Sequence, residues 1–150
     1  MKRVLSVLFA CCVVGTLFAA DSTWLTSVPE ARAKAEKEKK LVLLDFTGSD
    51  WCPWCIKLHT EVFSKPEFAD YAKKNLVLVK VDFPRNKPQS DELKAANKAL
   101  FEKYEIPAYP TLVVLKPDGT VVWKQVGYPN DGKESPLSTV IAKLDEAKTK

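Results

Sequence analysis

The chemistry that this sequence points to most directly rests on two cysteines. The stretch Trp51-Cys52-Pro53-Trp54-Cys55 places two thiols three positions apart, where an expected strand gives way to an expected helix. This is the layout of a redox-active dithiol. The chain has 4 cysteines, and the other two, Cys11 and Cys12, lie in an apolar N-terminal stretch with the character of a removable segment. With one pair left in the mature protein, no larger disulfide framework or cysteine metal cluster can form.

The expected helix start gives the two thiols different roles. A cysteine at a helix N-terminus faces unpaired backbone N–H groups and the positive end of the helix dipole, which stabilise a thiolate. Cys52 holds that position, and Pro53 suits the first turn because its missing N–H would be unpaired there anyway. Cys55 lies one turn further in, where we expect greater burial and a higher pKa. Cys52 is therefore the predicted nucleophile, and Cys55 the predicted resolving thiol.

Two other interpretations of the pair remain open. His59 follows Cys55 by four residues and so shares its helical face, which allows a copper-binding or zinc-binding module built from the Cys pair and His59. Zinc usually takes four ligands, however, and only carboxylates are left to complete the set, so we expect no metal site and no cofactor. The remaining alternative is a structural domain with an inert disulfide, whereas the flanking Trp51 and Trp54 favour an exposed docking site.

Residues 1–20 have the pattern of a secretory signal peptide. Met1-Lys2-Arg3 is basic, residues 4–20 carry no charge and are almost wholly apolar, and Asp21-Ser22-Thr23 is polar. We expect cleavage between Ala20 and Thr23 and a mature protein that is periplasmic or secreted. An uncleaved anchor is the alternative, although an apolar run of about 17 residues is at the short limit for spanning a bilayer. Membrane contact is expected only if the segment is retained.

Composition limits what residues 21–150 can be. A chain of 150 residues with 46% apolar and 28% charged residues is typical of one globular domain. Removing Lys2 and Arg3 takes two of the 23 basic residues and none of the 19 acidic ones, so the net charge falls from +4 to +2. This balance lacks the basic character of a nucleic-acid-binding protein. Because exported disulfides persist, we expect an upstream redox partner, besides client proteins with thiols or disulfides.

Alternating helices and strands surround the dithiol. We expect helices over 28–39, from Cys52 to about 63, from 64 onward, over 91–104 and over 136–147, and strands over 41–46, 76–83, 111–115 and 120–126. Pro117-Asp118-Gly119 joins the last two strands in a hairpin. The dithiol helix is expected to pack Ile56, Leu58, Val62 and Phe63 inward. Serines are expected at four helix starts: Ser27 and Ser64 in capping boxes, Ser90 as a cap, and Ser135 before Pro136. This order predicts an α/β fold with a mixed central sheet and helices on both faces.

Three stretches together resemble the thioredoxin superfamily. They are Leu43-Leu44-Asp45-Phe46, Trp51-Cys52-Pro53-Trp54-Cys55, and residues 103–111, Lys-Tyr-Glu-Ile-Pro-Ala-Tyr-Pro-Thr. Within the superfamily the chain is most similar to exported thioredoxin-like domains and to the C-terminal domain of the electron carrier DsbD. The resemblance implies the thioredoxin fold and a thiol-disulfide oxidoreductase that exchanges its Cys52–Cys55 dithiol or disulfide with client disulfides.

The resemblance also suggests roles for individual residues on the substrate side. Pro110 matches the family's cis-proline, which lies opposite the dithiol and presents the backbone of the preceding residue, here Tyr109, to a bound peptide. Trp51, Pro53 and Trp54 complete the expected substrate-binding set. Pro53 and Trp54 stand where thioredoxin itself has Gly-Pro, and this pair tunes the redox potential. The direction of electron flow therefore stays open.

A buried acid is the other expectation that comes from the resemblance. Asp45 is similar to the family's buried aspartate, which relays protons to the second cysteine, and Lys80 to the lysine paired with it. A carboxyl group beneath the dithiol would have a raised pKa and could act as general base for Cys55. The gap from Asp45 to Cys52 is one residue longer than in ordinary thioredoxin. The alternative, an aspartate at a strand end bonded to backbone groups, remains open.

Overall fold

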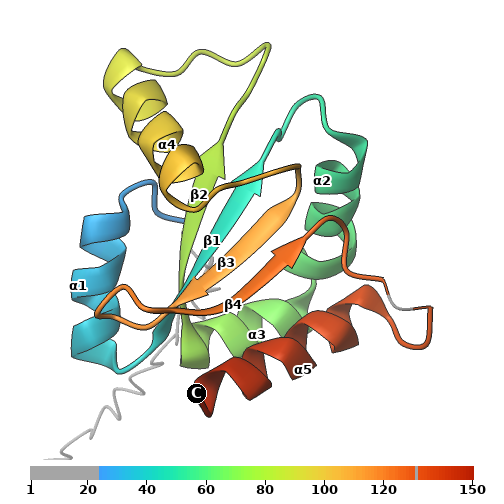
Figure 1. The fold of residues 1–150 in the computed structure, drawn as a ribbon. Helices are drawn as coiled ribbons and strands as arrows, with labels where there is room; N and C mark the ends of the chain where they lie inside the picture. Colours follow the sequence, from blue (N-terminus) through green and yellow to red (C-terminus); the bar gives the residue numbers. More distant parts are fainter. Residues whose placement is uncertain (1–23, 131) are drawn as a thin grey trace, which may run out of the picture.

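A four-stranded sheet in the order β2-β1-β3-β4 forms the centre of the computed structural model, which describes residues 24–130 and 132–150 (Figure 1). The strands are β1 (Leu41–Thr47), β2 (Leu76–Asp82), β3 (Thr111–Leu115) and β4 (Val121–Val126). β1 pairs in parallel with β2 and antiparallel with β3, which pairs antiparallel with β4. The expected mixed sheet is confirmed.

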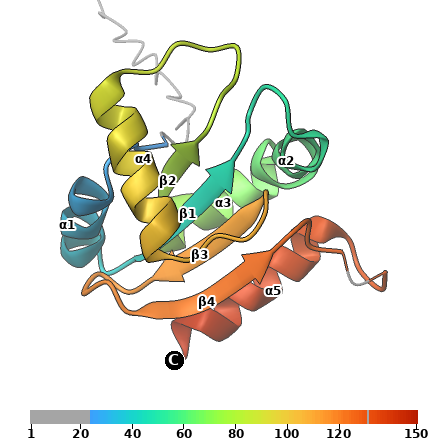
Figure 2. The same cartoon turned by 45° about the horizontal axis from the view of Figure 1, so that its top comes forward.

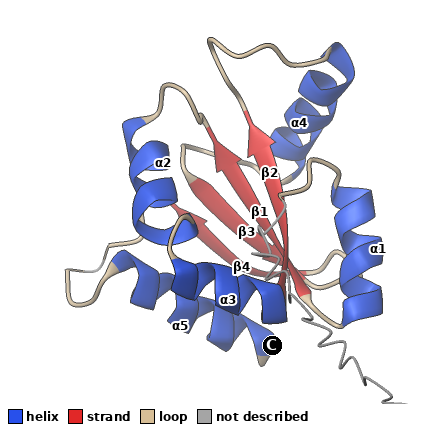
Figure 3. Ribbon diagram, turned by 180° about the vertical axis from the view of Figure 1, so that it is seen from behind, coloured by secondary structure: helices blue, strands red, loops and turns tan. Residues whose placement is uncertain are grey.

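Helices cover both faces of this sheet, as expected. They are α1 (Val28–Glu38), α2 (Pro53–Leu58), the π-helical turn η1 (His59–Phe63), α3 (Pro66–Asn75), α4 (Asp91–Lys103) and α5 (Pro136–Lys148). α1 and α4 lie on one face, while α2, α3 and α5 lie on the other (Figures 2 and 3). Among the residues that the structure describes, no helix combines the length and the apolar character needed to cross a bilayer. The expected signal peptide lies outside these residues.

The alternation of β1 decides which side chains face which helices. Val42, Leu44 and Phe46 are fully buried in the core under α1 and α4, whereas Leu43 is buried in the core under α2, α3 and α5. Successive side chains of a strand point to opposite faces, so Asp45 lies on the same face as Leu43. The strand therefore directs one carboxylate toward the face that α2 covers.

Serine side chains begin three of the helices, as the sequence predicts. The hydroxyls of Ser27, Ser90 and Ser135 accept hydrogen bonds from the third backbone N–H beyond them, at 3.4, 3.2 and 3.1 Å. Such caps satisfy N–H groups that have no partner inside the helix. The fourth expected cap is wrong, because Lys65 is the N-cap of α3 and makes no side-chain bond, while Ser64 ends the π-helical turn.

Ile56 is a second correction, because it was expected in the core and is 47% exposed. The inward stripe of the helix consists of Cys55, Leu58 and Val62, at i, i+3 and i+7. Ile56 is two residues from Leu58, a rotation of about 200° in an α-helix, and so points away from the sheet. Leu58, Val62 and Phe63 are buried as expected.

Phe68 tests the core under α3, where it is fully buried with its ring centroid 5.0 Å from that of Phe63. Phe68→Ala removes this packing and leaves a cavity, so the free energy of unfolding is expected to fall by about 3–5 kcal/mol. Urea unfolding followed by circular dichroism measures the change. Ile56→Ala is the exposed control and is expected to stay within about 0.5 kcal/mol. Equal losses for the two variants would contradict this core.

Candidate active site

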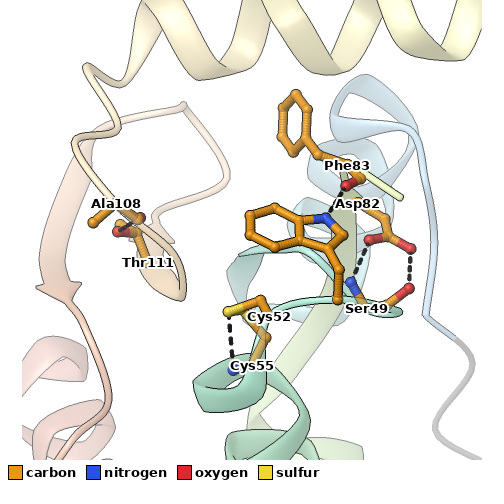
Figure 4. Close-up of a disulfide and its surroundings, with 8 residues drawn as sticks. Ser49, Cys52, Cys55, Asp82, Phe83, Ala108 and Thr111 are labelled. Carbon is orange, nitrogen blue, oxygen red and sulfur yellow. Dashed lines mark hydrogen bonds between the residues drawn. A yellow bond between two sulfur atoms is a disulfide. The ribbon is translucent and has the colours of Figure 1, made fainter. Parts of the chain in front are cut away.

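The two cysteines form a disulfide at the beginning of α2 (Figure 4). Cys52 is the N-cap, Pro53 occupies the first helical turn, and the Cα atoms of Cys52 and Cys55 are 5.2 Å apart. The backbone N–H of Cys55 donates a hydrogen bond to Sγ of Cys52 at 3.2 Å. This is the expected position for a sulfur that carries negative charge in the reduced protein, because helix N-terminal N–H groups stabilise an anion.

Burial does not distinguish the two cysteines in the way the sequence predicts. Each is 4% exposed, so the expected greater burial of Cys55 is wrong. The difference lies in the surroundings instead: Cys52 caps the helix beside the exposed Trp54, whereas Cys55 lines a polar pocket with Asp45.

Trp51 is held in place by contacts on every side. Its indole Nε1–H donates to the carbonyl oxygen of Phe83 at 2.8 Å, and the guanidinium of Arg85 lies 3.9 Å above the ring. The ring of Tyr109 meets it edge-on, with 5.8 Å between centroids. Gly48 lies directly beneath, where a Cβ atom would come 2.5 Å from ring atom Cε2. Trp51 therefore joins the loop after β1 to the loop before β3.

The loop between β1 and Cys52 is anchored by hydrogen bonds of two of its residues, Ser49 and Asp50. The backbone N–H and the hydroxyl of Ser49 donate to the two carboxylate oxygens of Asp82, at 3.0 and 2.6 Å (Figure 4). Asp50 accepts hydrogen bonds from the backbone N–H groups of Arg85 and Asn86, at 3.0 and 2.7 Å. These N–H groups, Arg85's first, lower the pKa of Asp50. The longer loop is thus bound to the segment that follows β2.

The Tyr109–Pro110 peptide bond is cis, as the resemblance implies. Figure 4 shows Ala108 and Thr111 on the loop that faces the disulfide, where the Thr111 hydroxyl donates to the carbonyl of Ala108 at 2.7 Å. The rings of Phe83 and Phe101 pack against that of Tyr109, with centroids 5.5 and 6.0 Å away. Burial raises the pKa of the Tyr109 hydroxyl.

A second aromatic pair, Trp54 and Tyr128, lies beside the dithiol helix. Trp54 is 56% exposed, and its ring centroid is 5.5 Å from that of Tyr128. The Tyr128 hydroxyl donates to the carboxylate of Glu61, and Lys57 Nζ lies 5.5 Å from the Trp54 centroid and 5.0 Å from the Tyr128 centroid. A pocket of about 340 Å³ is bordered by Trp54, Tyr109, Gly127, Tyr128 and Asn130.

Three members of this pocket were missed by the sequence analysis, namely Gly127, Tyr128 and Asn130. They follow β4 and come to the dithiol only because the sheet order places β4 beside β3. The backbone N–H of Gly127 donates to the carbonyl of Pro110 at 2.8 Å, which links the two loops. The sole local signal was a glycine directly after a strand, which marks a turn and no particular site.

Asp45 and Lys80 are brought together by the pairing of β1 with β2, in which they are register partners. Asp45 is 5% exposed, and its Oδ1 atom is buried without a hydrogen-bond partner. Burial raises the pKa of Asp45 to about 7, an effect that the charge of Lys80 opposes and that of Asp82 reinforces. The orphaned oxygen argues against the alternative in which backbone groups bind this carboxylate.

A pocket of about 190 Å³ is lined by both this acid and Cys55. Its lining comes from β1, the loop after it, α2, η1, β2 and the loop before α4, and consists of Asp45, Thr47, Ser49, Cys55, Ile56, His59, Lys80 and Lys87. Of the sequence-predicted site residues, Asp45, Lys80 and Cys55 therefore meet here, while Trp54 and Tyr109 border the separate pocket of about 340 Å³.

The metal-binding alternative gains no support from this geometry. Across residues 24–130 and 132–150, no group of three or more His, Cys, Asp or Glu side chains is arranged to hold a metal ion. His59 borders the same pocket as Cys55 and Asp45, yet Cys55 is engaged in the disulfide.

Comparison with known proteins agrees with the fold and with the dithiol. A family model described as a thioredoxin-like domain matches residues 28–135. The disulfide bond reductase DsbH of Chlamydia pneumoniae is 33% identical over 126 residues, covering 84% of this chain and 75% of that protein.

Solved structures give the same result. A structure titled DsbH Oxidoreductase superposes with a TM-score of 0.75 and 28% identity, over 99% of this chain and 95% of that one. The reduced C-terminal domain of Neisseria meningitidis DsbD superposes with a TM-score of 0.56 at 23% identity, over 79% of this chain and 91% of that one. The DsbD match supports a shared fold and nothing further.

Gly48→Ala tests the contact beneath Trp51. The new methyl group and the indole cannot occupy the same space, so we expect the ring to move, its hydrogen bond to Phe83 to weaken, and the free energy of unfolding to fall by about 1–3 kcal/mol. Urea unfolding and the NMR signal of the indole N–H report both effects. In a Trp51→Ala background, Gly48→Ala is expected to change the free energy of unfolding little. An undiminished loss of stability in that background would refute the contact.

Asp45→Asn tests the buried acid. Folded Asp45 keeps its proton up to a pKa of about 7, whereas the unfolded side chain loses it near the ordinary pKa of 3.8. The free energy of unfolding of the wild type therefore falls as pH rises through this window. The variant lacks that loss and is expected to be more stable above pH 7, by up to about 4 kcal/mol.

Urea unfolding of the oxidised protein at several pH values measures this difference. Asp50→Asn is the control of opposite sign, because its carboxylate is stabilised by backbone N–H groups and its removal is expected to lower stability at neutral pH. A stability difference for Asp45→Asn that does not change with pH would show that Asp45 titrates normally.

Proposed function

This chain belongs to the thioredoxin-like domain family, and from that premise we propose that it is an exported thiol-disulfide oxidoreductase that reduces disulfides in client proteins. The observation that carries the proposal is the Cys52–Cys55 disulfide at the start of α2, facing the loop of the cis Tyr109–Pro110 bond. One side of this disulfide is bordered by aromatic rings, and the other by a polar pocket with a buried acid.

The reaction begins with the reduced protein. The Cys52 thiolate, stabilised at the helix N-terminus, attacks one sulfur of a client disulfide, and the other client sulfur leaves as a thiolate. Cys55 then gives its proton to the Asp45 carboxylate and attacks Sγ of Cys52. The second client sulfur leaves, and the Cys52–Cys55 disulfide forms. Two electrons have moved from the protein dithiol to the client.

Asp45 suits the role of general base in this step. A base is most effective when its pKa is near the working pH, and burial brings the pKa of Asp45 to about 7. It lines the same pocket as Cys55, and Lys80, its neighbour across the β1–β2 pair, opposes the effect of burial. In this proposal Lys80 keeps the acid ionisable at neutral pH.

Substrate binding is assigned to the rim of the dithiol. Trp51, Pro53 and Trp54 flank the two cysteines in sequence, and Tyr109-Pro110 faces them from the loop before β3. A client chain extended along this loop would place its disulfide over Cys52, with main-chain bonds supplying affinity and side-chain pockets supplying selectivity. The pocket beside Trp54 and Tyr128 extends this rim.

The proposed direction of electron flow is toward the client. It is supported by the similarity to DsbH, a protein named as a disulfide bond reductase. Export rests on the basic start and the apolar run through Ala20, with residues 21–150 as the mature domain. In the periplasm such a reductase needs an upstream partner that returns electrons to Cys52–Cys55, because the compartment favours disulfides.

Cys55→Ser tests the assignment of roles. Without the resolving thiol the mixed disulfide cannot be released, so incubation of the reduced variant with a disulfide-containing protein such as insulin is expected to yield a covalent adduct through Cys52. Non-reducing electrophoresis and mass spectrometry detect it. Cys52→Ser is the matched control and is expected to form no such adduct. Comparable adducts from both variants would refute the assigned roles.

The reduction potential tests the function itself. We expect a value for the Cys52–Cys55 couple between about −300 and −200 mV, near the ~−270 mV of thioredoxin. Equilibration with glutathione or dithiothreitol mixtures measures it. A value below about −300 mV would support the inert structural disulfide instead, and a value near −120 mV would identify a donor of disulfides.

A further inference from the structure

The polar pocket beneath the dithiol is lined by an imidazole that the mechanism above does not use, that of His59. Asp45 must lose the proton it receives from Cys55 before the next cycle, yet the carboxyl group is 5% exposed and its Oδ1 atom has no hydrogen-bond partner. A buried acid that takes a proton in every turnover needs a route by which that proton reaches solvent. Asp45 borders the polar pocket, which offers such a route.

The pocket has the size and the lining for such a route. Its volume of about 190 Å³ has room for several water molecules, at roughly 30 Å³ each. Asp45 and Cys55 border its inner part, and hydroxyl groups of Thr47 and Ser49 offer further hydrogen-bonding partners. Water therefore finds enough polar groups to be held between the acid and the outside.

His59 is one of the lining residues that reach solvent, together with Ile56 and Lys87, and it is the imidazole among them. It is an exposed residue, and it follows Cys55 by four positions, so the two side chains share one face of the helix. It is also the first residue of the π-helical turn, directly after α2 ends at Leu58. π-helical turns within α-helices frequently occur at functional sites.

The other charged groups around the pocket are lysines and carboxylates. Facing it are Lys80 and Asp82 from β2, Lys87 from the loop before α4, and Asp45 and Cys55 themselves. Both lysines are cations, and the Asp82 carboxylate accepts two hydrogen bonds from Ser49. On the outer side of the turn, Glu61 is bound by the hydroxyl of Tyr128. An imidazole is the one lining group that suits proton exchange near pH 7.

We propose that His59 carries protons between Asp45 and solvent through the pocket that both residues line, so that it sets the rate at which the buried acid is reset. The proposal rests on the oxidoreductase function proposed above. When a client is reduced, the Cys55 S–H bond breaks and an O–H bond forms on Asp45. That proton passes through pocket water to the imidazole and then to bulk water. When the protein is re-reduced, a proton returns along the same route to Cys55.

The electrostatics of His59 fit this role. Burial, and secondarily the charge of Lys80, lower the pKa of His59 below its usual 6.5, so the imidazole is neutral at pH 7 and free to accept a proton. Because its pKa is low, His59 passes the proton on instead of retaining it. His59 acts through Asp45, and its loss is expected to slow the reaction without abolishing it.

The experiment compares His59→Ala and His59→Gln with the wild type. The reduced proteins are mixed with excess insulin, and formation of the Cys52–Cys55 disulfide is followed by stopped-flow tryptophan fluorescence at pH 6–8. We expect the rate of disulfide formation to fall about tenfold in both variants, less than the ~10²–10⁴-fold contributed by a direct general acid or base. Thr60→Ala, in the same turn but outside the pocket lining, is the matched control.

Chemical rescue separates proton transfer from structural damage. Added imidazole buffer is expected to restore most of the His59→Ala rate in proportion to its concentration, while leaving wild type and Thr60→Ala unchanged. In an Asp45→Asn background, removing His59 is expected to have no further effect. An unchanged rate, a loss that imidazole does not restore, or a full additional loss in the Asp45→Asn background would each overturn the proposal.

Failure of the His59 proposal can be distinguished from failure of the proposed oxidoreductase function. If the chain were not an oxidoreductase, the wild type would form no disulfide with insulin at any pH, and neither variant could be slower. Thermal unfolding of both His59 variants, monitored by circular dichroism, shows whether each is folded. Because Gln keeps a polar side chain at this exposed position, His59→Gln gives a folded variant even if the alanine substitution disturbs the turn.

Discussion

The pairing of β1 with two neighbours at once is the constraint on which the site depends. Its parallel register with β2 places Lys80 beside Asp45, and its antiparallel register with β3 places the loop of Pro110 at the same end of the sheet as the cysteines. A shift of one residue in β1 would turn Asp45 toward α1 and α4 and Leu44 toward α2. The buried, almost wholly apolar character of this strand therefore fixes the chemistry as well as the fold.

The two sides of the disulfide differ in a way that matches the two tasks of an exchange reaction. Aromatic rings of Trp51, Trp54 and Tyr128 surround one side, where a polypeptide has to be held by contacts of moderate strength. Ionisable groups border the pocket under Cys55, where the proposed reaction moves only protons. In that proposal, the separation keeps the proton route clear of the surface that a client would cover.

Features that depend on neighbouring residues in the chain could be predicted from the sequence, whereas features that depend on contacts between distant segments could not. The helix caps at Ser27, Ser90 and Ser135, the position of Cys52 and the strands, each within one residue of its expected limits, all follow from local rules. The cis bond before Pro110 came from the family resemblance. Tyr128 lies more than seventy residues from Trp54, so only the sheet order brings the two rings together. The exposure of Ile56 and the equal burial of the two cysteines likewise depend on tertiary packing.

The π-helical turn at His59–Phe63 has a consequence for how this chain is compared with others. A π turn takes up one residue more than an α turn, so it accommodates an insertion without rotating the residues on either side. The helix can then present Cys55 and Leu58 inward before the turn and Phe63 inward after it. An ungapped alignment with a relative whose helix is uninterrupted would match the wrong residues after Leu58. Residues equivalent to His59 and Glu61 in a relative therefore have to be identified by superposing the two backbones. Counting residues along the two sequences would pair the wrong positions within this turn.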